Sequence, residues 1–305
     1  MKVVVTGALG HIGSSLIRQL KGADEIILVD NLLTQRYASL FDLPENKKYK
    51  FILADVTRDD LTEIFSGADY VIHLAAITDA ETSHEKPAEV EQVNLEGTKR
   101  VAEACLKTGS KLFFPSTTSV YGSQEKVVDE ACTELKPQSP YAESKLAAEK
   151  YLAEKGKAGL KFVICRFGTI FGWSVGMRFH TAVNKFIWQA VNGLPLSVWQ
   201  TAWQQKRPYL DLNDCVSAVN FILKKDLFDG EIYNVLTSNF TVENIVEAIK
   251  KFIPDLKVDF VSSPIMNQLS YDVSDDKLKK VGFKPQGNLE KGIKDTISHL
   301  EVLRQ

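Results

Sequence analysis

The sequence predicts an α/β protein with a Rossmann-type, doubly wound parallel sheet and a smaller mixed C-terminal lobe. Short β-rich runs alternate with longer helical segments through the first half of the chain, the order that a parallel sheet with crossover helices requires. A glycine-rich turn separates the first predicted strand from the first predicted helix, as at the ligand-binding edge of doubly wound sheets. The second half loses this alternation and is expected to build the smaller lobe.

Six apolar runs are expected to form the buried strands of the sheet. They are Lys2–Thr6, Glu25–Asp30, Lys50–Ala54, Tyr70–Leu74, Lys111–Ser116 and Lys161–Arg166. Between them, helical periodicity is clearest at Pro87–Thr108 and Tyr141–Gly156. Right-handed crossovers between parallel strands place helices on both faces of the sheet, which gives the doubly wound topology.

The pattern changes after about Gly172, and all four tryptophans follow closely. They are Trp173, Trp188, Trp199 and Trp203. They could stack on a base or a sugar, but core packing is favoured for most of them. Further elements are predicted at Leu210–Leu223, Glu231–Val235, Thr241–Phe252 and Leu289–Leu303. We expect a nucleotide-binding domain at residues 1–170, to which 210–236 return, and a substrate-binding lobe made of residues 171–209 and 237–305.

The composition argues against several classes of function. A formal net charge of −2 and a pI near 6.3 leave no global basic field to hold a nucleic acid polymer. We expect no membrane association, because no run of about 20 apolar residues is present, and no signal peptide, because its pattern is missing. The cysteines (Cys105, Cys132, Cys165 and Cys215) lack the spacing of a disulfide framework or a zinc site. We therefore expect a cytoplasmic protein without a metal.

The glycine-rich turn runs from Gly7 to Gly13 and leads into a helix predicted at Ser14–Leu20. Glycines let the backbone fold tightly and approach a diphosphate, while the free N–H groups of the helix N-terminus face the anion. The spacing of Gly7, Gly10 and Gly13 is GxxGxxG rather than GxGxxG. A plain structural turn is the alternative, but the order of strand, glycines and helix favours a dinucleotide site.

Two carboxylates are placed to bind the adenosine half of such a cofactor. Asp30 closes the second predicted strand, 17 residues beyond Gly13 (30 − 13), where a carboxylate accepts hydrogen bonds from the ribose hydroxyls. It would repel a 2′-phosphate, so NAD is favoured over NADP. Arg36 could soften this preference, but we expect it to face solvent. Asp55 is placed to meet the adenine amino group, and a helix-capping role is its alternative.

Tyr141 and Lys145 are four residues apart, so they share one face of a predicted helix. A cation beside a phenol favours the phenolate, so we expect the pKa of Tyr141 to be lowered. A hydroxyl residue at a neighbouring strand end, within Pro115–Gly122, could share the hydrogen bond of a substrate alcohol. Such a set removes a proton from an alcohol while hydride leaves its carbon. The tyrosine–lysine pair alone carries little weight, but here it follows a Rossmann-type half.

At this point the chain resembles the extended short-chain dehydrogenase/reductase family and, within it, the NAD-dependent epimerase/dehydratase branch. The resemblance spans nearly the whole chain. It includes the glycine turn, Asp30, Asp55-Val56, Leu74-Ala75-Ala76, Asn94–Thr98, Pro115–Gly122, Tyr141–Lys145, Arg166–Gly172 and Arg207-Pro208-Tyr209. It implies that Tyr141 is the general base and that Lys145 binds the nicotinamide ribose. Thr117 is then the third catalytic group, with Thr118 and Ser116 as competing assignments.

The resemblance also implies which residues contact NAD. They are Gly7, Gly10, His11, Ile12, Gly13, Asp30, Asn31, Asp55, Val56, Leu74, Ala75, Ala76 and Asn94, together with Tyr141 and Lys145. Asn94 supports the active-site end of its helix in this family, and a purely structural asparagine is the alternative.

The two residues after the catalytic threonine distinguish the branches of the family. Dehydratases resembling the hexose 4,6-dehydratases carry an Asp-Glu pair there, and decarboxylases keep a glutamate at the second place. This chain has Thr118 and Ser119, so dehydration and decarboxylation are disfavoured. The expected substrate contacts are Thr118, Ser119, Thr169, Arg178, Asn184 and Arg207. Arg207 matches the arginine that sugar-nucleotide epimerases present to the diphosphate, whereas galactose-type epimerases have asparagine at the place of Thr169.

These features resemble UDP-glucose 4-epimerases. They imply an NAD-dependent epimerase, acting at C4 of a UDP-hexose through transient oxidation to a 4-keto sugar, with Tyr141 as base and hydride return to either face. The alternative is a dehydrogenase or reductase of the same fold with net redox turnover on a 4-ketosugar nucleotide, a small alcohol or an amino acid. A non-catalytic NAD-binding regulator is a remote alternative, because it would be expected to lose Tyr141 or Lys145. By analogy, a homodimer is expected through the helices Pro87–Thr108 and Tyr141–Gly156.

Overall fold

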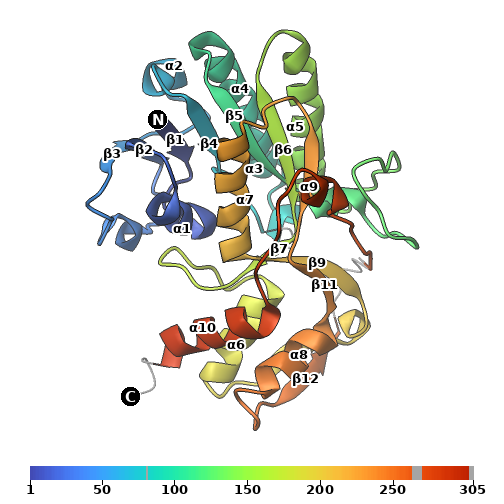
Figure 1. The fold of residues 1–305 in the computed structure, drawn as a ribbon. Coiled ribbons are helices and arrows are strands. Elements are labelled where there is room, and N and C mark those ends of the chain that lie inside the picture. Colours follow the sequence, from blue (N-terminus) through green and yellow to red (C-terminus); the bar gives the residue numbers. More distant parts are fainter. Residues whose placement is uncertain (80–81, 263–269, 302–305) are drawn as a thin grey trace.

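A seven-stranded parallel sheet forms the larger part of the molecule in the computed structural model, which describes residues 1–79, 82–262 and 270–301 (Figure 1). Its strands are β1 (Lys2–Thr6), β2 (Glu25–Asp30), β3 (Lys48–Leu53), β4 (Tyr70–His73), β5 (Lys111–Thr117), β6 (Phe162–Phe167) and β10 (Ile232–Val235). They lie in the order β10-β6-β5-β4-β1-β2-β3, and every pairing is parallel. The predicted fold class is confirmed, with strand ends within two residues of the expected ones.

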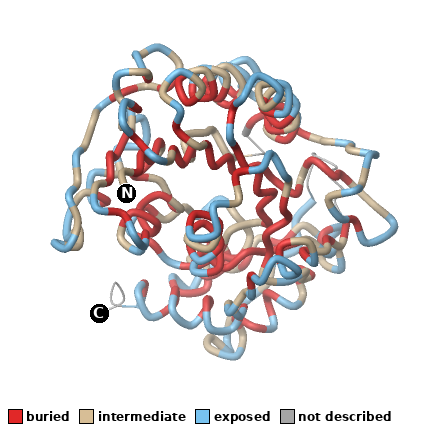
Figure 2. Tube along the Cα trace, turned by 45° about the horizontal axis from the view of Figure 1, so that its top comes forward, coloured by how far each residue is buried: buried red, intermediate tan, exposed pale blue. Residues whose placement is uncertain are grey.

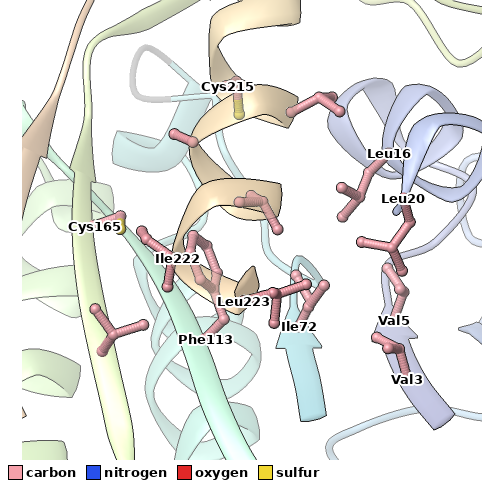
Figure 3. Close-up of a cluster of buried hydrophobic side chains, with 14 of the residues drawn as sticks. Val3, Val5, Leu16, Leu20, Ile72, Phe113, Cys165, Cys215, Ile222 and Leu223 are labelled. Carbon is pink, nitrogen blue, oxygen red and sulfur yellow. The ribbon is translucent and has the colours of Figure 1, made fainter. Parts of the chain in front are cut away.

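Helices cover both faces of this sheet. The helices are α1 (His11–Gln19) and α7 (Leu212–Lys225) on one face, and α2 (Leu61–Phe65), α4 (Gly97–Thr108) and α5 (Pro140–Lys157) on the other. Successive side chains of a strand alternate between the faces, so Val3 and Val5 pack into the first layer and Val4 into the second. Figure 3 shows the first layer, where Leu16 of α1, Leu20 directly after this helix and Ile222 of α7 lie over the sheet.

The predicted helix Pro87–Thr108 is one helical segment with a change of winding inside it. α3 (Pro87–Glu91) continues into a π-helical turn at Gln92–Glu96 and then into α4, which ends at Gly109 with φ of +76°. A π-helical turn carries one extra residue and often occurs at functional sites. Here the turn contains Asn94, one of the predicted site residues.

The smaller lobe lies below the sheet in Figure 1. Its strands are β7 (Thr169–Phe171), β8 (Leu196–Trp199), β9 (Lys206–Asp211), β11 (Ser238–Thr241) and β12 (Val258–Val261), and its helices are α6 (Ala182–Val191), α8 (Val242–Lys250) and α10 (Leu289–Glu301). One sheet has the order β11-β9-β7, and β12 pairs with β8. The three helices enclose a core that includes Ile187, Ile245 and Ile293. The last two residues of the predicted helix Leu289–Leu303 lie outside the described residues.

Residues 210–236 belong mainly to the large sheet, because they contain α7 and the edge strand β10. The short helix α9 (Asp276–Lys280) also packs beside β10. Figure 2 shows the buried residues concentrated in the sheet and under its helices. All four cysteines are free thiols. Within the described residues, no helix is long and apolar enough to cross a membrane. The roles predicted for the two parts of the chain stay predictions at this stage.

Candidate active site

A cavity of about 350 Å³ opens where the carboxyl ends of the sheet strands face the smaller lobe. Ligands of open α/β sheets bind at this edge, and the volume is within the usual range for ligand pockets. Fourteen of the predicted site residues line it: Gly7, Gly10, His11, Ile12, Gly13, Leu74, Ala76, Thr117, Ser119, Tyr141, Lys145, Thr169, Arg178 and Arg207. The glycine turn, the end of β5, the start of α5 and the smaller lobe therefore meet at one site.

The glycine turn has the shape that a dinucleotide diphosphate requires. Gly7 has a φ of +65°, and a Cβ there would lie 2.6 Å from Ala75 N. A Cβ at Gly13 would lie 2.5 Å from the carbonyl oxygen of Ala8. At Gly10, a Cβ would lie 3.3 Å from the carbonyl oxygen of Gly7, a less severe but still close contact. No side chain caps the first turn of α1, so its N–H groups are available to an anion. These residues fit NAD.

The residues predicted for the adenosine half lie beside the cavity rather than on its lining. The Asp30 carboxylate ends β2 and accepts hydrogen bonds from Leu9 N at 3.1 Å and Leu32 N at 2.9 Å. Asn31 donates to Asp55 Oδ2 at 3.2 Å, which joins the two strand ends. Val56 is buried, with a Cγ atom 3.0 Å from the Cβ position of Gly97. The carboxylates are thus held in place by their neighbours, and their contacts with a nucleotide stay predictions.

The three predicted catalytic residues lie together. Ser139 caps α5 by accepting a hydrogen bond from Ala142 N, which sets the first turn of the helix and thereby Tyr141. Thr117 ends β5 and is hydrogen-bonded to Tyr141. One turn along the helix, Lys145 Nζ donates to the carbonyl of Pro115 at 2.9 Å. Its ammonium lies 4.6 Å from the centre of a phenylalanine ring. The chain therefore brings a phenol, an amine and a hydroxyl to one end of the cavity.

Burial dominates the ionisation of this group. It raises the pKa of Tyr141 to about 12, although the hydrogen bond from Thr117 and the charge of Arg178 act in the opposite direction. It lowers the pKa of Lys145 to about 7, against the charge of Glu149. The expected lowering of the pKa of Tyr141 is therefore wrong for the chain's own groups, because the desolvation of the phenolate outweighs the neighbouring positive charges.

A buried ion pair lies behind Lys145. Glu149, one further turn along α5, accepts from Arg166 Nε at 3.0 Å and from Nη2 at 2.7 Å. Both side chains are at most 4% exposed, and Ser116 also donates to the glutamate. Glu149 was not among the predicted site residues. Its signal was the repeated spacing of four in Tyr141, Lys145 and Glu149, which puts all three on one helix face.

Asn94 ties the loop after β4 to α5. Its Oδ1 accepts from Ile77 N at 2.8 Å, and its Nδ2 donates to the carbonyl of Ile77 and to Ser144 Oγ. It is 1% exposed and does not line the cavity. The side chain therefore supports the segment that carries Leu74 and Ala76 rather than facing the cavity itself.

Two residues predicted to bind the substrate are buried and make hydrogen bonds within the protein instead. Thr118 is buried, and its hydroxyl donates to the carbonyl of Phe167 at 3.2 Å. Asn184 is fully buried, accepts from Gly172 N at 3.1 Å and donates to the carbonyl of Arg178 at 3.1 Å. Neither lines the cavity. Asn184 holds the start of α6 against the segment after β7, which the sequence pattern did not reveal.

Several lining residues were not predicted. Lys185, next to Asn184, lines the cavity, as do Asp79 and Trp199. His180 also lines the cavity, and burial lowers its pKa to about 4. Arg36 was expected to face solvent. It is partly buried instead, and burial lowers its pKa. Their positions follow from the folding of the smaller lobe and of the loop after β2, which periodicity does not encode.

The sequence pattern of the NAD-dependent epimerase/dehydratase family matches residues 3–235. The chain belongs to this family. A protein of Bacillus subtilis described as an uncharacterized UDP-glucose epimerase is 30% identical, with 100% of this chain and 99% of that protein covered. The mouse dTDP-D-glucose 4,6-dehydratase is 31% identical over 97% of this chain and 87% of its own.

Among solved structures, UDP-glucuronic acid 4-epimerase from Bacillus cereus, in complex with UDP-glucuronic acid and NAD, has a TM-score of 0.90. The two chains are 26% identical, with 99% of this chain and 100% of that chain covered. The chain is therefore an enzyme of the extended short-chain dehydrogenase/reductase type, and its cofactor is NAD. The predictions of family, enzyme class and cofactor are confirmed.

Within the described residues, no group of three or more His, Cys, Asp or Glu side chains could hold a metal ion. For a member of this NAD-dependent family, the expected chemistry is the transfer of a proton and a hydride. The three residues predicted to carry out that chemistry, Thr117, Tyr141 and Lys145, all line the cavity.

Proposed function

We propose that this enzyme is an epimerase that inverts C4 of a UDP-hexose. The observation that carries the proposal is one cavity with two kinds of lining. Thr117, Tyr141 and Lys145 lie on the side of the large sheet, and the cations Lys185 and Arg207 lie on the side of the smaller lobe. An alcohol at the first group and a diphosphate at the second are the two ends of a sugar nucleotide. The similarity to UDP-sugar epimerases along the whole chain supports the same substrate class.

The chemistry follows from the residues at the large-sheet end. NAD, when bound, supplies the acceptor and later the donor of the hydride. Tyr141, held by Thr117, removes the proton of the C4 hydroxyl. It returns this proton after the keto sugar has rotated and presents its other face to the hydride. Lys145, one turn along α5, would bind the nicotinamide ribose and, in its protonated form, would favour the phenolate. Since the proton and the hydride both return, the reaction leaves no net redox change.

The residues after Thr117 favour epimerisation over dehydration. Elimination of water from a sugar needs an acid and a base at adjacent carbons, and the dehydratases of the family supply a carboxylate pair. Here Thr118 is turned into the core and Ser119 alone lines the cavity. Neither carries a carboxylate. The dehydratase similarity in the comparisons therefore reflects the common fold and cofactor.

The test is to incubate the purified enzyme and NAD with a panel of UDP-, dTDP-, GDP- and CDP-sugars. Products are separated while the absorbance of NADH is followed. We expect an isomeric UDP-hexose without accumulation of NADH, and no product with Tyr141→Phe. Accumulating NADH would instead establish a dehydrogenase, and a dehydrated keto sugar would establish a dehydratase. Absence of turnover with every sugar nucleotide would overturn the substrate class.

Arg207→Ala tests the diphosphate end separately. Arginine binds diphosphates through planar, charge-assisted hydrogen bonds, so its loss should raise the KM for the sugar nucleotide by about tenfold or more. The affinity for NAD should stay within a factor of about two. Steady-state kinetics and NAD titrations measure the two effects. An unchanged KM would show that the diphosphate binds elsewhere in the cavity.

We also propose that the enzyme is a homodimer, as is common in the family, through the outer faces of α4 and α5. Leu146 and Ala147 on α5 are half-buried, yet belong to none of the hydrophobic cores among the described residues. The exposed Lys150 and Glu154 continue the same side of the helix. A second copy of this helix pair would cover these apolar side chains.

A further inference from the structure

Three side chains near the glycine turn have buried hydrogen-bonding atoms without a partner among the described residues. They are His11 Nε2, Arg36 Nη1 and Arg178 Nε. Buried polar atoms are nearly always paired in proteins, so three in one region require an explanation. His11 is only 8% exposed and lines the cavity, as does Arg178. Each of the three atoms is a possible donor and none is a carboxylate, which is the chemistry of an anion site.

The three side chains come from separate segments and are oriented by the protein. His11 Nδ1 lies 2.7 Å from Ser174 Oγ. When this hydroxyl donates to Nδ1, Nε2 carries the ring proton. Arg36 Nη1 would lie 3.9 Å from a Cβ on Gly10, so this side chain reaches the glycine turn. Arg178 Nη1 is hydrogen-bonded to Thr78 Oγ1 after β4, which leaves its Nε unpartnered among the described groups.

The charges of this cluster also favour an anion. Burial is the largest cause that lowers the pKa of Arg178, and the positive charge of Arg36 is the second largest. Burial, followed by the charges of Arg178, Arg36 and His180, lowers the pKa of His11 to about 3, so its ring is neutral at physiological pH. Asp30 acts on Arg36 and Asp79 acts on Arg178 in the opposite direction. Two arginines brought together at the edge of a nucleotide cradle are stabilised by a ligand with two negative charges.

We propose that His11, Arg36 and Arg178 bind the diphosphate of NAD, in addition to the backbone N–H groups of the glycine turn. The inference depends on NAD as the cofactor and does not depend on which sugar nucleotide is the substrate. It moves Arg178 from the predicted substrate contacts to the cofactor. Ser174, through its contact with Nδ1, is the residue that positions His11.

The cluster also connects cofactor binding to the smaller lobe. Ser174 and Arg178 lie in the segment that leads from β7 to α6. In this segment Gly176 N donates to Ser14 Oγ at 3.0 Å, and a Cβ on Gly176 would lie 2.5 Å from the carbonyl of Leu9. The segment is thus packed directly on the glycine turn. Release of NAD then requires the Arg178 contact to open, so dissociation should be slow.

The test compares His11→Phe, Arg36→Met and Arg178→Met with Lys224→Met, which removes one charge from an exposed position on α7. Calorimetric titrations of the full-length protein use NAD, ADP-ribose and adenosine. ADP-ribose contains the diphosphate without the nicotinamide, and adenosine has neither. We expect each cluster variant to bind NAD and ADP-ribose about tenfold more weakly or worse, because a charge-assisted hydrogen bond is lost. Adenosine affinity should not change, and the control should match the wild type.

The dissociation rate of NAD, measured by displacement, should rise in Arg178→Met and in Ser174→Ala. Arg36→Lys and Arg178→Lys, which keep the charge, should recover part of the affinity and exclude loss of folding as the cause. Unchanged binding of ADP-ribose in all three cluster variants would overturn the proposal. An equal loss of adenosine binding would also overturn it, because the damage would then be general. Weaker UDP binding by Arg178→Met with unchanged ADP-ribose binding would return Arg178 to the substrate.

Discussion

The phenol of Tyr141 is the residue on which the proposed chemistry depends. Burial raises its pKa to about 12, and Thr117 and Arg178 provide the opposing influences within the chain. Tyr141→Phe removes the proton acceptor and keeps the ring, so turnover should fall by about 10²-fold to 10⁴-fold. NAD affinity, measured by titration, should not change. A variant that keeps more than a few per cent of activity would show that another group is the base.

Asp30 offers a test of cofactor choice at a single residue. Its carboxylate accepts hydrogen bonds from Leu9 N and Leu32 N, so Asp30→Ala removes both the charge and these contacts. Asp30→Asn is the matched variant, because its amide oxygen can still accept one of them. Both substitutions should weaken the binding of NAD. Both variants should also bind NADP better relative to NAD, since the repulsion of a 2′-phosphate is lost. Kd values for both cofactors measure this, and an unchanged preference would remove the ribose assignment.

At the scale of residues, sequence reasoning worked where spacing alone determines geometry. Tyr141 and Lys145 share a helix face because they are four apart, and the glycine turn follows a strand. Sequence reasoning failed where the surroundings of a residue determine its pKa or the direction of its side chain. The pKa of Tyr141 depends on burial, which spacing does not give. Likewise Asn184 points into the protein while Lys185 lines the cavity, a difference of one residue on a helix whose rotation is set by packing.

At the scale of elements, β6 and α5 are joined by the ion pair of Arg166 and Glu149, which lies one turn behind Lys145. The glutamate raises the pKa of Lys145 against the lowering by burial. Glu149→Gln should therefore lower the pKa of Lys145, so the alkaline limb of the activity profile should move to lower pH. Arg166→Met leaves the glutamate uncompensated and should move the same limb to higher pH.

The two substitutions are matched controls for each other. Each breaks the same buried pair and should destabilise the fold by about 3–5 kcal/mol. A purely structural role would change both profiles alike, whereas control of Lys145 requires shifts in opposite directions. The pH dependence of kcat and the thermal unfolding of both variants separate these cases. Shifts in the same direction would contradict the coupling.

The elements of the large sheet were predictable because buried parallel strands are continuous apolar runs between helices. In the smaller lobe the helices α8 and α10 were predicted, at Thr241–Phe252 and Leu289–Leu303, but the short strands were not. β7 has three residues and β11 has four, too few for a periodic signal. The helix predicted at Pro87–Thr108 was found, but its π-helical turn was not expected; this turn contains Asn94, which contacts Ile77 and Ser144. Such contacts join distant parts of the chain and leave no local pattern.

At the scale of the whole molecule, the proposed dimer rests on the half-buried apolar side chains of α5. In a two-fold symmetric dimer the same helix faces its own copy, so a charge introduced near the axis is repeated opposite itself. Ala147→Glu places such a charge on the proposed interface. Ser217→Glu introduces the same charge at an exposed position of α7, which covers the other face of the sheet, and is the control. One protomer is 34.1 kDa, and light scattering after gel filtration measures the mass directly.

We expect the wild type and Ser217→Glu to have twice the protomer mass, and Ala147→Glu to approach a single protomer. Because Tyr141 and Lys145 are on the opposite side of α5 and buried against β5, dissociation should leave NAD binding in place. Dissociation should lower the activity only if it loosens the packing of α5, which carries Tyr141 and Lys145. A wild-type enzyme with the mass of one protomer at micromolar concentration would contradict the dimer. A dimeric Ala147→Glu would place the interface on another face of the molecule.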